Sequence, residues 1–232
     1  MIAELKRRAH QANLEIVAHG LVVLTWGNAS AIDRARGLVA IKPSGVPYSD
    51  LQPDDLVLVD LETGETVDSS LKPSSDTPTH LALYRAFPEI GGVVHTHSPR
   101  ATAWAQAGHD LPCYGTTHAD HFYGTIPCTP PMTTSEIDGA YEHETGLAIA
   151  RTFADRRIAA LEVPGVLLHG HAPFCWGATV EEAVHHAVVL EAVAGLATDT
   201  LRINPDAQPI SQALLTKHHS RKHGVSAYYG QP

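Results

Sequence analysis

Two histidines stand one residue apart at the end of a short apolar run, GGVVHTHS. Side chains at positions i and i+2 of a strand lie on the same face, so the imidazoles of His95 and His97 can converge on one point. Such a pair is either a metal site or a hydrogen-bonded pair that closes a strand. A second pair, His169 and His171, ends another apolar run. Catalytic zinc takes three protein ligands and keeps one position open, so the two pairs together predict a metal site.

Two loops with the letters KPS offer groups that favour phosphate. In LKPSSDTPTH the serines precede a helix start, where free N–H groups and the helix dipole favour an anion. The loop in IKPSG is either a phosphate site or an ordinary surface turn. Asp76 follows the serines and is either a helix cap or a carboxylate ligand or base beside the metal. The candidate phosphate groups are Lys42, Ser44, Gly45, Ser74 and Ser75.

A third polar stretch, TTHADHFYG, places Asp120 between His118 and His121. An aspartate buried among histidines fits a general acid or base, because its neighbours can hold its protonation state. A polar surface loop is the alternative. The basic stretch HHSRKHGVSAYYG near the C-terminus is, on its own, expected to be a solvated end.

Composition limits the classes of function. The 232 residues, 44% of them hydrophobic, predict one domain or at most two, and we expect one. The net charge is −9 and the basic residues are dispersed, so we expect no nucleic-acid partner. No apolar stretch approaches a membrane span or a leader, which predicts a soluble, cytoplasmic protein. The three cysteines are odd in number and widely separated, so we expect them to be reduced and structural.

Strands and helices mix without a regular βαβ rhythm, which favours a central sheet flanked by helices. Thr179 and Glu182 form a predicted capping box at the start of a long helix. We expect helices over residues 2–19, 78–87, 101–108, 135–156 and 180–201, strands over 21–25, 37–45, 55–65, 91–98, 158–160 and 164–177, and short strands between 109 and 131.

The motifs, taken together and in order, resemble the class II aldolase and epimerase family. The resemblance runs nearly end to end, and is weakest from about residue 195 to residue 213. It implies a three-layer α/β/α fold with a central, mainly antiparallel sheet. It also implies one domain over residues 1–232, a homotetramer, and a C-terminal segment, 214–232, that reaches a neighbouring subunit's active site. The motifs are LTWGNAS, IKPSGVPYSD, KPSSDTPTH, GGVVHTHS, WAQAG, THADHFYGTIPC, PGVLLHGHAPFCWG and KHHSRKHG followed by AYYGQ.

The resemblance also implies roles for single residues. Zinc, or manganese in its place, would be held by His95, His97 and His171, with Asp76 as a ligand or close partner. Asp120 and Tyr229, the latter from a neighbouring subunit, would be the acid and base. Two departures from the family pattern are His121, where we expect an aromatic residue, and Pro130-Pro131, where we expect basic residues. The implied substrate-binding residues are Gly27, Asn28, Lys42, Ser44, Gly45, Ser74, Ser75, Thr116, His218 and Arg221.

The implied activity is the interconversion of L-ribulose 5-phosphate and D-xylulose 5-phosphate at C4, by retro-aldol cleavage and re-addition without a redox cofactor. Arabinose or ascorbate catabolism would supply the same substrate. One alternative is a zinc-dependent class II aldolase acting on a sugar phosphate such as fuculose 1-phosphate. Another is an adducin-like interaction domain that lacks the metal chemistry, against which all three histidines argue.

Overall fold

The computed structural model describes residues 2–223 and residue 227. Within this part of the chain, seven strands form one sheet in the order β4-β3-β2-β1-β5-β7-β6, and every neighbouring pair is antiparallel. The strands are β1 (Gly27–Asp33), β2 (Leu38–Ile41), β3 (Val57–Asp60), β4 (Thr66–Asp68), β5 (Gly92–Thr96), β6 (Gly165–Leu167) and β7 (Pro173–Gly177).

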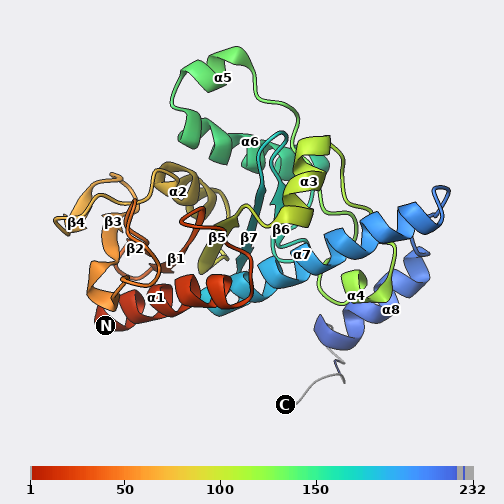
Figure 1. The fold of residues 1–232 in the computed structure, drawn as a ribbon, viewed down its shortest axis with the longest axis horizontal. Coiled ribbons are helices and arrows are strands. Elements are labelled where there is room, and N and C mark those ends of the chain that lie inside the picture. The colour runs from red at the N-terminus through yellow and green to blue at the C-terminus, as the bar shows by residue number, and fades with distance from the viewer. Residues whose placement is uncertain (1, 224–226, 228–232) are drawn as a thin grey trace.

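Helices cover both faces of the sheet, with α1 and α7 on one face and α2 and α6 on the other (Figure 1). The predicted three-layer fold with an antiparallel sheet is therefore confirmed. No helix in the described ranges has the length and apolar character needed to cross a membrane. The helices are α1 (Ile2–Ala18), α2 (Thr77–Ala86), α3 (Pro99–Ala107), α4 (Thr116–Ala119), α5 (Thr134–Asp138), α6 (Tyr141–Arg156), α7 (Val180–Ile203) and α8 (Gln212–His223), with a 3₁₀ turn η1 (Pro53–Asp55).

The central strand β1 shows how the layers are joined. On the α2 face, the Ser30 hydroxyl contacts Nδ1 of His80 at 2.7 Å and the Tyr84 hydroxyl at 2.9 Å. On the α1 side, the Asn13 amide of α1 bonds both the N–H and the C=O of Ala29. Side chains alternate along a strand, so Asn28 lies on the same face as Ser30. The α2 face of β1 therefore carries the polar groups.

The start of α7 lies directly over β5 and β7. Gly92 and Gly177 pair across these strands, and a Cβ on Gly92 would lie 2.2 Å from Cα of Val180. The Thr179 hydroxyl accepts a hydrogen bond from the Glu182 N–H. The Glu182 carboxylate bonds the Ala178 N–H instead of the Thr179 N–H, so half of the predicted capping box forms.

The expected strand over residues 21–25 is wrong. This segment is a turn in which Leu24 has φ +56° and is 76% exposed, and the first strand begins at Gly27. The expected short strands before residue 131 are also wrong, because the described chain has only isolated bridges and α4 there.

Three further predictions need correction. The helix expected over 135–156 is interrupted at Gly139, which gives α5 and α6. Residues 158–160 are not a strand, since α6 ends at Arg156, its C-cap residue Arg157 lies in the left-handed region, and a turn follows. Residues 164–177 form two strands, β6 and β7, and the His-Gly-His sequence lies in the turn between them.

Candidate functional site

Three imidazoles converge where β5 meets the turn between β6 and β7. His95 and His97 come from the end of β5, and His171 comes from the turn. Their candidate ligand nitrogens lie within 4.8 Å of one another, and the Nε2 atoms of His97 and His171 are 3.2 Å apart. His169 is not in this cluster, because its ring packs against Gly108. Three neutral nitrogens at one point are a donor set that suits zinc.

A hydrogen bond and burial set the protonation states of the three imidazoles. A carbonyl oxygen only accepts hydrogen bonds, so the 2.9 Å contact with Pro173 O fixes the proton of His95 on Nδ1 and directs the Nε2 lone pair to the site. The ring of Phe174 stacks on His95 with centroids 4.1 Å apart. Burial lowers the pKa of His95 to about 3, and it lowers the pKa values of His97 and His171 too. The imidazoles are therefore neutral at pH 7, as a metal ligand must be.

Asp76 lies at the N-cap position of α2, but its carboxylate caps no N–H of that helix. Oδ2 accepts a hydrogen bond from Nδ2 of Asn28 at 2.6 Å instead. Burial acts to raise the pKa of Asp76, but the imidazoles of His95 and His80 and the bond from Asn28 outweigh burial, and the pKa lies below its usual value. Asp76 lines the same cavity as the three histidines, although it is not in their cluster of mutually close ligand atoms.

The two KPS loops lie side by side. The Ser44 N–H donates to Lys72 O at 2.9 Å, and the Ser74 N–H donates to Lys42 O at 3.0 Å. The buried Lys42 ammonium donates to Val46 O at 2.6 Å and lies 4.7 Å from the centroid of the Tyr48 ring. Burial lowers the pKa of Lys42. The loops thus bring a lysine, serines and a flexible glycine together, as a phosphate group requires.

Both loops and the histidines open onto one cavity of about 550 Å³. Asn28 pairs with His95 across β1 and β5, and its amide bonds the Ser74 hydroxyl at 3.0 Å as well as Asp76. Of the predicted site residues, the cavity brings together Gly27, Asn28, Lys42, Ser44, Gly45, Ser74, Ser75, Asp76, His95, His97 and His171.

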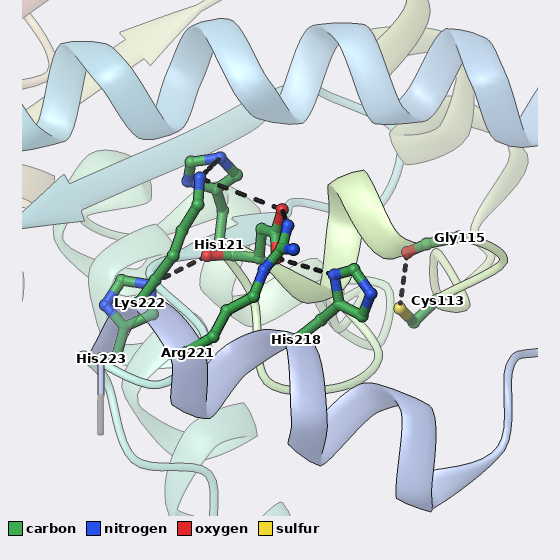
Figure 2. Close-up of polar contacts among 8 residues, drawn as sticks. Cys113, Gly115, His121, His218, Arg221, Lys222 and His223 are labelled. Carbon is green, nitrogen blue, oxygen red and sulfur yellow. Dashed lines mark hydrogen bonds and ion pairs between the residues drawn. The ribbon is translucent and has the colours of Figure 1, made fainter. Parts of the chain in front are cut away.

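Asp120, at the C-terminal end of α4, belongs to a second cluster, which α4 forms with α8. Figure 2 shows the side chains that α8 contributes to this cluster, which include His218 and Arg221. The Asp120 carboxylate accepts bonds from Arg221 Nη2 at 2.7 Å and from His218 Nδ1 at 3.0 Å. Burial acts to raise the pKa of Asp120, but Arg221 and His218 outweigh it and lower the pKa. The basic C-terminal stretch is therefore a docked helix up to His223, and the expectation of a solvated end is wrong for this part.

The neighbours of Asp120 do not reach the cavity of the same chain. Asp120, Thr116, His218 and Arg221 are absent from its lining. His121 contacts Lys222 Nζ at 3.3 Å and His185 at 3.2 Å, and burial lowers its pKa to about 4, so it is neutral beside Asp120. The predicted Tyr229 lies outside the described residues.

Sequence reasoning missed two aromatic residues near the histidines. Trp26 lines the cavity, with its ring centroid 6.4 Å from that of His97. The Tyr141 hydroxyl contacts Nδ1 of His171 at 3.4 Å. Trp26 belongs to the motif LTWGNAS, so the motif could have identified it as a site residue. Nothing in the sequence near Tyr141 points to the site.

Known proteins resemble this chain along nearly all of its length. A model of the Class II Aldolase and Adducin N-terminal domain matches residues 7–198. Proteins named L-ribulose-5-phosphate 4-epimerase UlaF from Salmonella paratyphi C (strain RKS4594) and Salmonella typhi are each 52% identical over 228 residues, which cover 98% of this chain and 99% of theirs.

Solved structures share the fold. An L-fuculose 1-phosphate aldolase aligns over 94% of this chain and 95% of its own, with a TM-score of 0.78 at 21% identity. The l-fuculose-1-phosphate aldolase from Thermus thermophilus aligns over 90% of this chain and 100% of its own, with a TM-score of 0.69 at 26% identity.

Proposed function

Because the chain belongs to the class II aldolase and adducin family, we propose that it is a metal-dependent epimerase that interconverts L-ribulose 5-phosphate and D-xylulose 5-phosphate at C4. The observation that carries the proposal is one cavity that joins three neutral imidazoles to two paired KPS loops. The substrate is inferred from the relatives, which are 52% identical along their whole length and carry the epimerase name.

The residues of the cavity fit a divalent metal ion. His95, His97 and His171 would hold the ion. Asp76 lines the same cavity and would act as a further ligand or as a base. The all-nitrogen set and the neutral protonation states suit zinc, and manganese is the alternative. The bound ion would supply Lewis-acid stabilisation of negative charge on the substrate oxygens.

The paired loops would hold the phosphate end of the substrate. Lys42 supplies positive charge, and Ser44 and Ser74 supply hydroxyl donors. Gly45 has no side chain, and nothing lies within 4 Å of a Cβ built there, so its main chain is open to a close approach. A fragment that carries the phosphate would stay tethered there after the carbon–carbon bond breaks. Tethering is what distinguishes epimerisation from release of the two fragments.

Epimerisation at C4 then needs two proton-transfer groups on opposite faces of the tethered aldehyde. Removal of the C4 hydroxyl proton breaks the C3–C4 bond, and glycolaldehyde phosphate turns its other carbonyl face before the bond forms again. We assign these groups to Asp120 and Tyr229. The lowered pKa of Asp120 keeps its carboxylate ionised, so it begins as a base on one face.

The separation of Asp120 from the cavity supports a site shared between subunits. Asp120 bonds Arg221 of its own α8 and does not line the cavity of its own chain. We therefore propose a homotetramer, in which the C-terminal segment of one chain would bring Tyr229 to the site of its neighbour. Trp26, which lines the cavity, is 53% exposed, and Leu24, two residues before it, is 76% exposed. Both apolar side chains would be covered in such an assembly. A phosphorylated substrate also favours a cytoplasmic location.

The test incubates the purified protein with L-ribulose 5-phosphate, with and without prior chelation, and measures D-xylulose 5-phosphate and free glycolaldehyde phosphate. We expect chelator-sensitive formation of xylulose 5-phosphate without accumulation of the aldehyde. His171→Asn should abolish turnover and metal binding, whereas His169→Asn, outside the cluster, should keep both. Free aldehyde would indicate an aldolase, and absence of both turnover and bound metal would indicate an adducin-like interaction domain.

A further inference from the structure

Each imidazole of a metal site has a second ring nitrogen, and its partner decides which nitrogen carries the proton. For His95 that partner is Pro173 O, a main-chain group. For His171 it is a side chain, because the Tyr141 hydroxyl lies 3.4 Å from Nδ1. Neither the sequence motifs nor the cavity lining assigns a role to Tyr141.

The orientation of the His171 ring explains why its contact with Tyr141 bears on metal binding. Its Nε2 atom faces Nε2 of His97 at 3.2 Å, so Nε2 is the nitrogen that points to the centre of the cluster. A neutral imidazole has one N–H and one lone pair, so an Nε2 lone pair requires the proton on Nδ1. The phenol oxygen of Tyr141 can accept a hydrogen bond from Nδ1–H of His171, and this bond favours the tautomer that binds a metal.

Tyr141 is held in place by the packing of two helices. It is the first residue of α6, and the next residue, Glu142, accepts a hydrogen bond through its carbonyl oxygen from the Thr79 hydroxyl of α2. One turn later, Gly146 lets the helices touch, since a Cβ there would lie 2.5 Å from Cβ of Ala82. The N-cap residue of α2 is Asp76, so one rigid helix pair carries both Tyr141 and Asp76.

We propose that Tyr141 is a positioning residue that accepts a hydrogen bond from Nδ1–H of His171 and fixes the tautomer and ring orientation of that imidazole. This inference rests on the metal site of the proposed function. Tyr141 does not line the cavity, so it acts through His171 and not on the substrate.

Tyr141→Phe removes the hydroxyl and keeps the ring. We expect the zinc dissociation constant, measured by competition with a chromophoric chelator, to rise about tenfold, the low end of the effect of such outer partners. The absorption spectrum of the cobalt-substituted protein should change as well, and kcat should fall with little change in KM. The control is Tyr123→Phe, which removes a hydroxyl from its bond with Thr216 on another part of the chain and should leave zinc affinity unchanged.

A second measurement does not depend on metal or activity. In the metal-free protein, nitrogen NMR of His171 should show the Nδ1-protonated tautomer, and its share should fall in Tyr141→Phe. Unchanged zinc affinity together with an unchanged tautomer would overturn the inference. If the unmodified protein binds no zinc, the proposed metal site fails, and the tautomer measurement alone then decides whether Tyr141 orients His171.

Discussion

Gly27→Ala should damage both the stability and the site of this protein. Gly27 has φ +127°, a conformation that side-chain-bearing residues rarely adopt and that costs of the order of 1–3 kcal/mol. An added Cβ would lie 2.8 Å from His95 O and 3.3 Å from Cα of Thr96. Relieving such an overpacked contact costs about 1–3 kcal/mol more. We therefore expect a loss of roughly 2–6 kcal/mol, against a typical total of about 5–15 kcal/mol.

The contact between Gly27 and β5 also predicts which part of the site the substitution disturbs. Gly27 pairs with Thr96, and the next pair is Asn28 with His95, so separating the strands at Gly27 moves the pair that borders the cavity. A displacement of about 1 Å in a catalytic site can cost on the order of 100-fold in rate. Zinc affinity should fall together with kcat/KM, because the main chain of His95 is the atom group that must move.

Gly20→Ala is the matched control. Gly20 follows α1 with φ +69°, and nothing lies within 4 Å of a Cβ built there, so only the left-handed conformation is penalised, by about 1–2 kcal/mol. Urea unfolding at one fixed protein concentration, followed by circular dichroism, measures both losses. If Gly27→Ala costs no more than Gly20→Ala and keeps full kcat/KM, the close approach of β1 to β5 is not what requires glycine.

Two further predictions concern charge. Lys42→Met should raise KM for a phosphorylated substrate roughly 10- to 150-fold, from the loss of about 1.5–3 kcal/mol in charged hydrogen bonds, and steady-state kinetics beside an unchanged zinc affinity would check it. The pKa of Asp120 is lowered in the folded protein, so its bonds to α8 contribute fully above the ordinary carboxyl pKa of about 3.9 and are lost as the pH falls through the lower native value. Hydrogen exchange of the α8 amides should show this loss in acid, and Asp120→Asn should show weak protection at every pH; equal protection in both proteins would contradict the reasoning.

The fold was predictable where local composition and tertiary contacts agree. The β-branched run before His95 predicts a strand, and Pro78 predicts the first turn of α2, as the structure has them. The strand β1 escaped prediction because its sequence, GNASAID, is rich in small residues of low β propensity. Those small residues fit because α1 packs against one face of β1 and Ser30 meets His80 and Tyr84 of α2 on the other, contacts that no local window contains.

The two histidine pairs show the same limit within the site. The period-two rule holds for His95 and His97 because both extend from strand β5, and their ring centroids lie 5.0 Å apart. It does not hold for His169 and His171, because Gly170 has φ +72° and the pair spans a turn. The turn sends His171 to the cluster and His169 to Gly108. Pattern alone could not choose between them.

Asp76 shows how backbone conformation decides between two roles that the sequence left open. An N-cap residue has an extended backbone, from which its side chain reaches the second or third N–H of the helix. Asp76 has φ −74° and ψ −2°, a helical conformation, so its carboxylate is turned away from those N–H groups and toward Asn28. Because Asn28 pairs with His95, the same conformation that prevents capping delivers a carboxylate to the cavity of the three histidines.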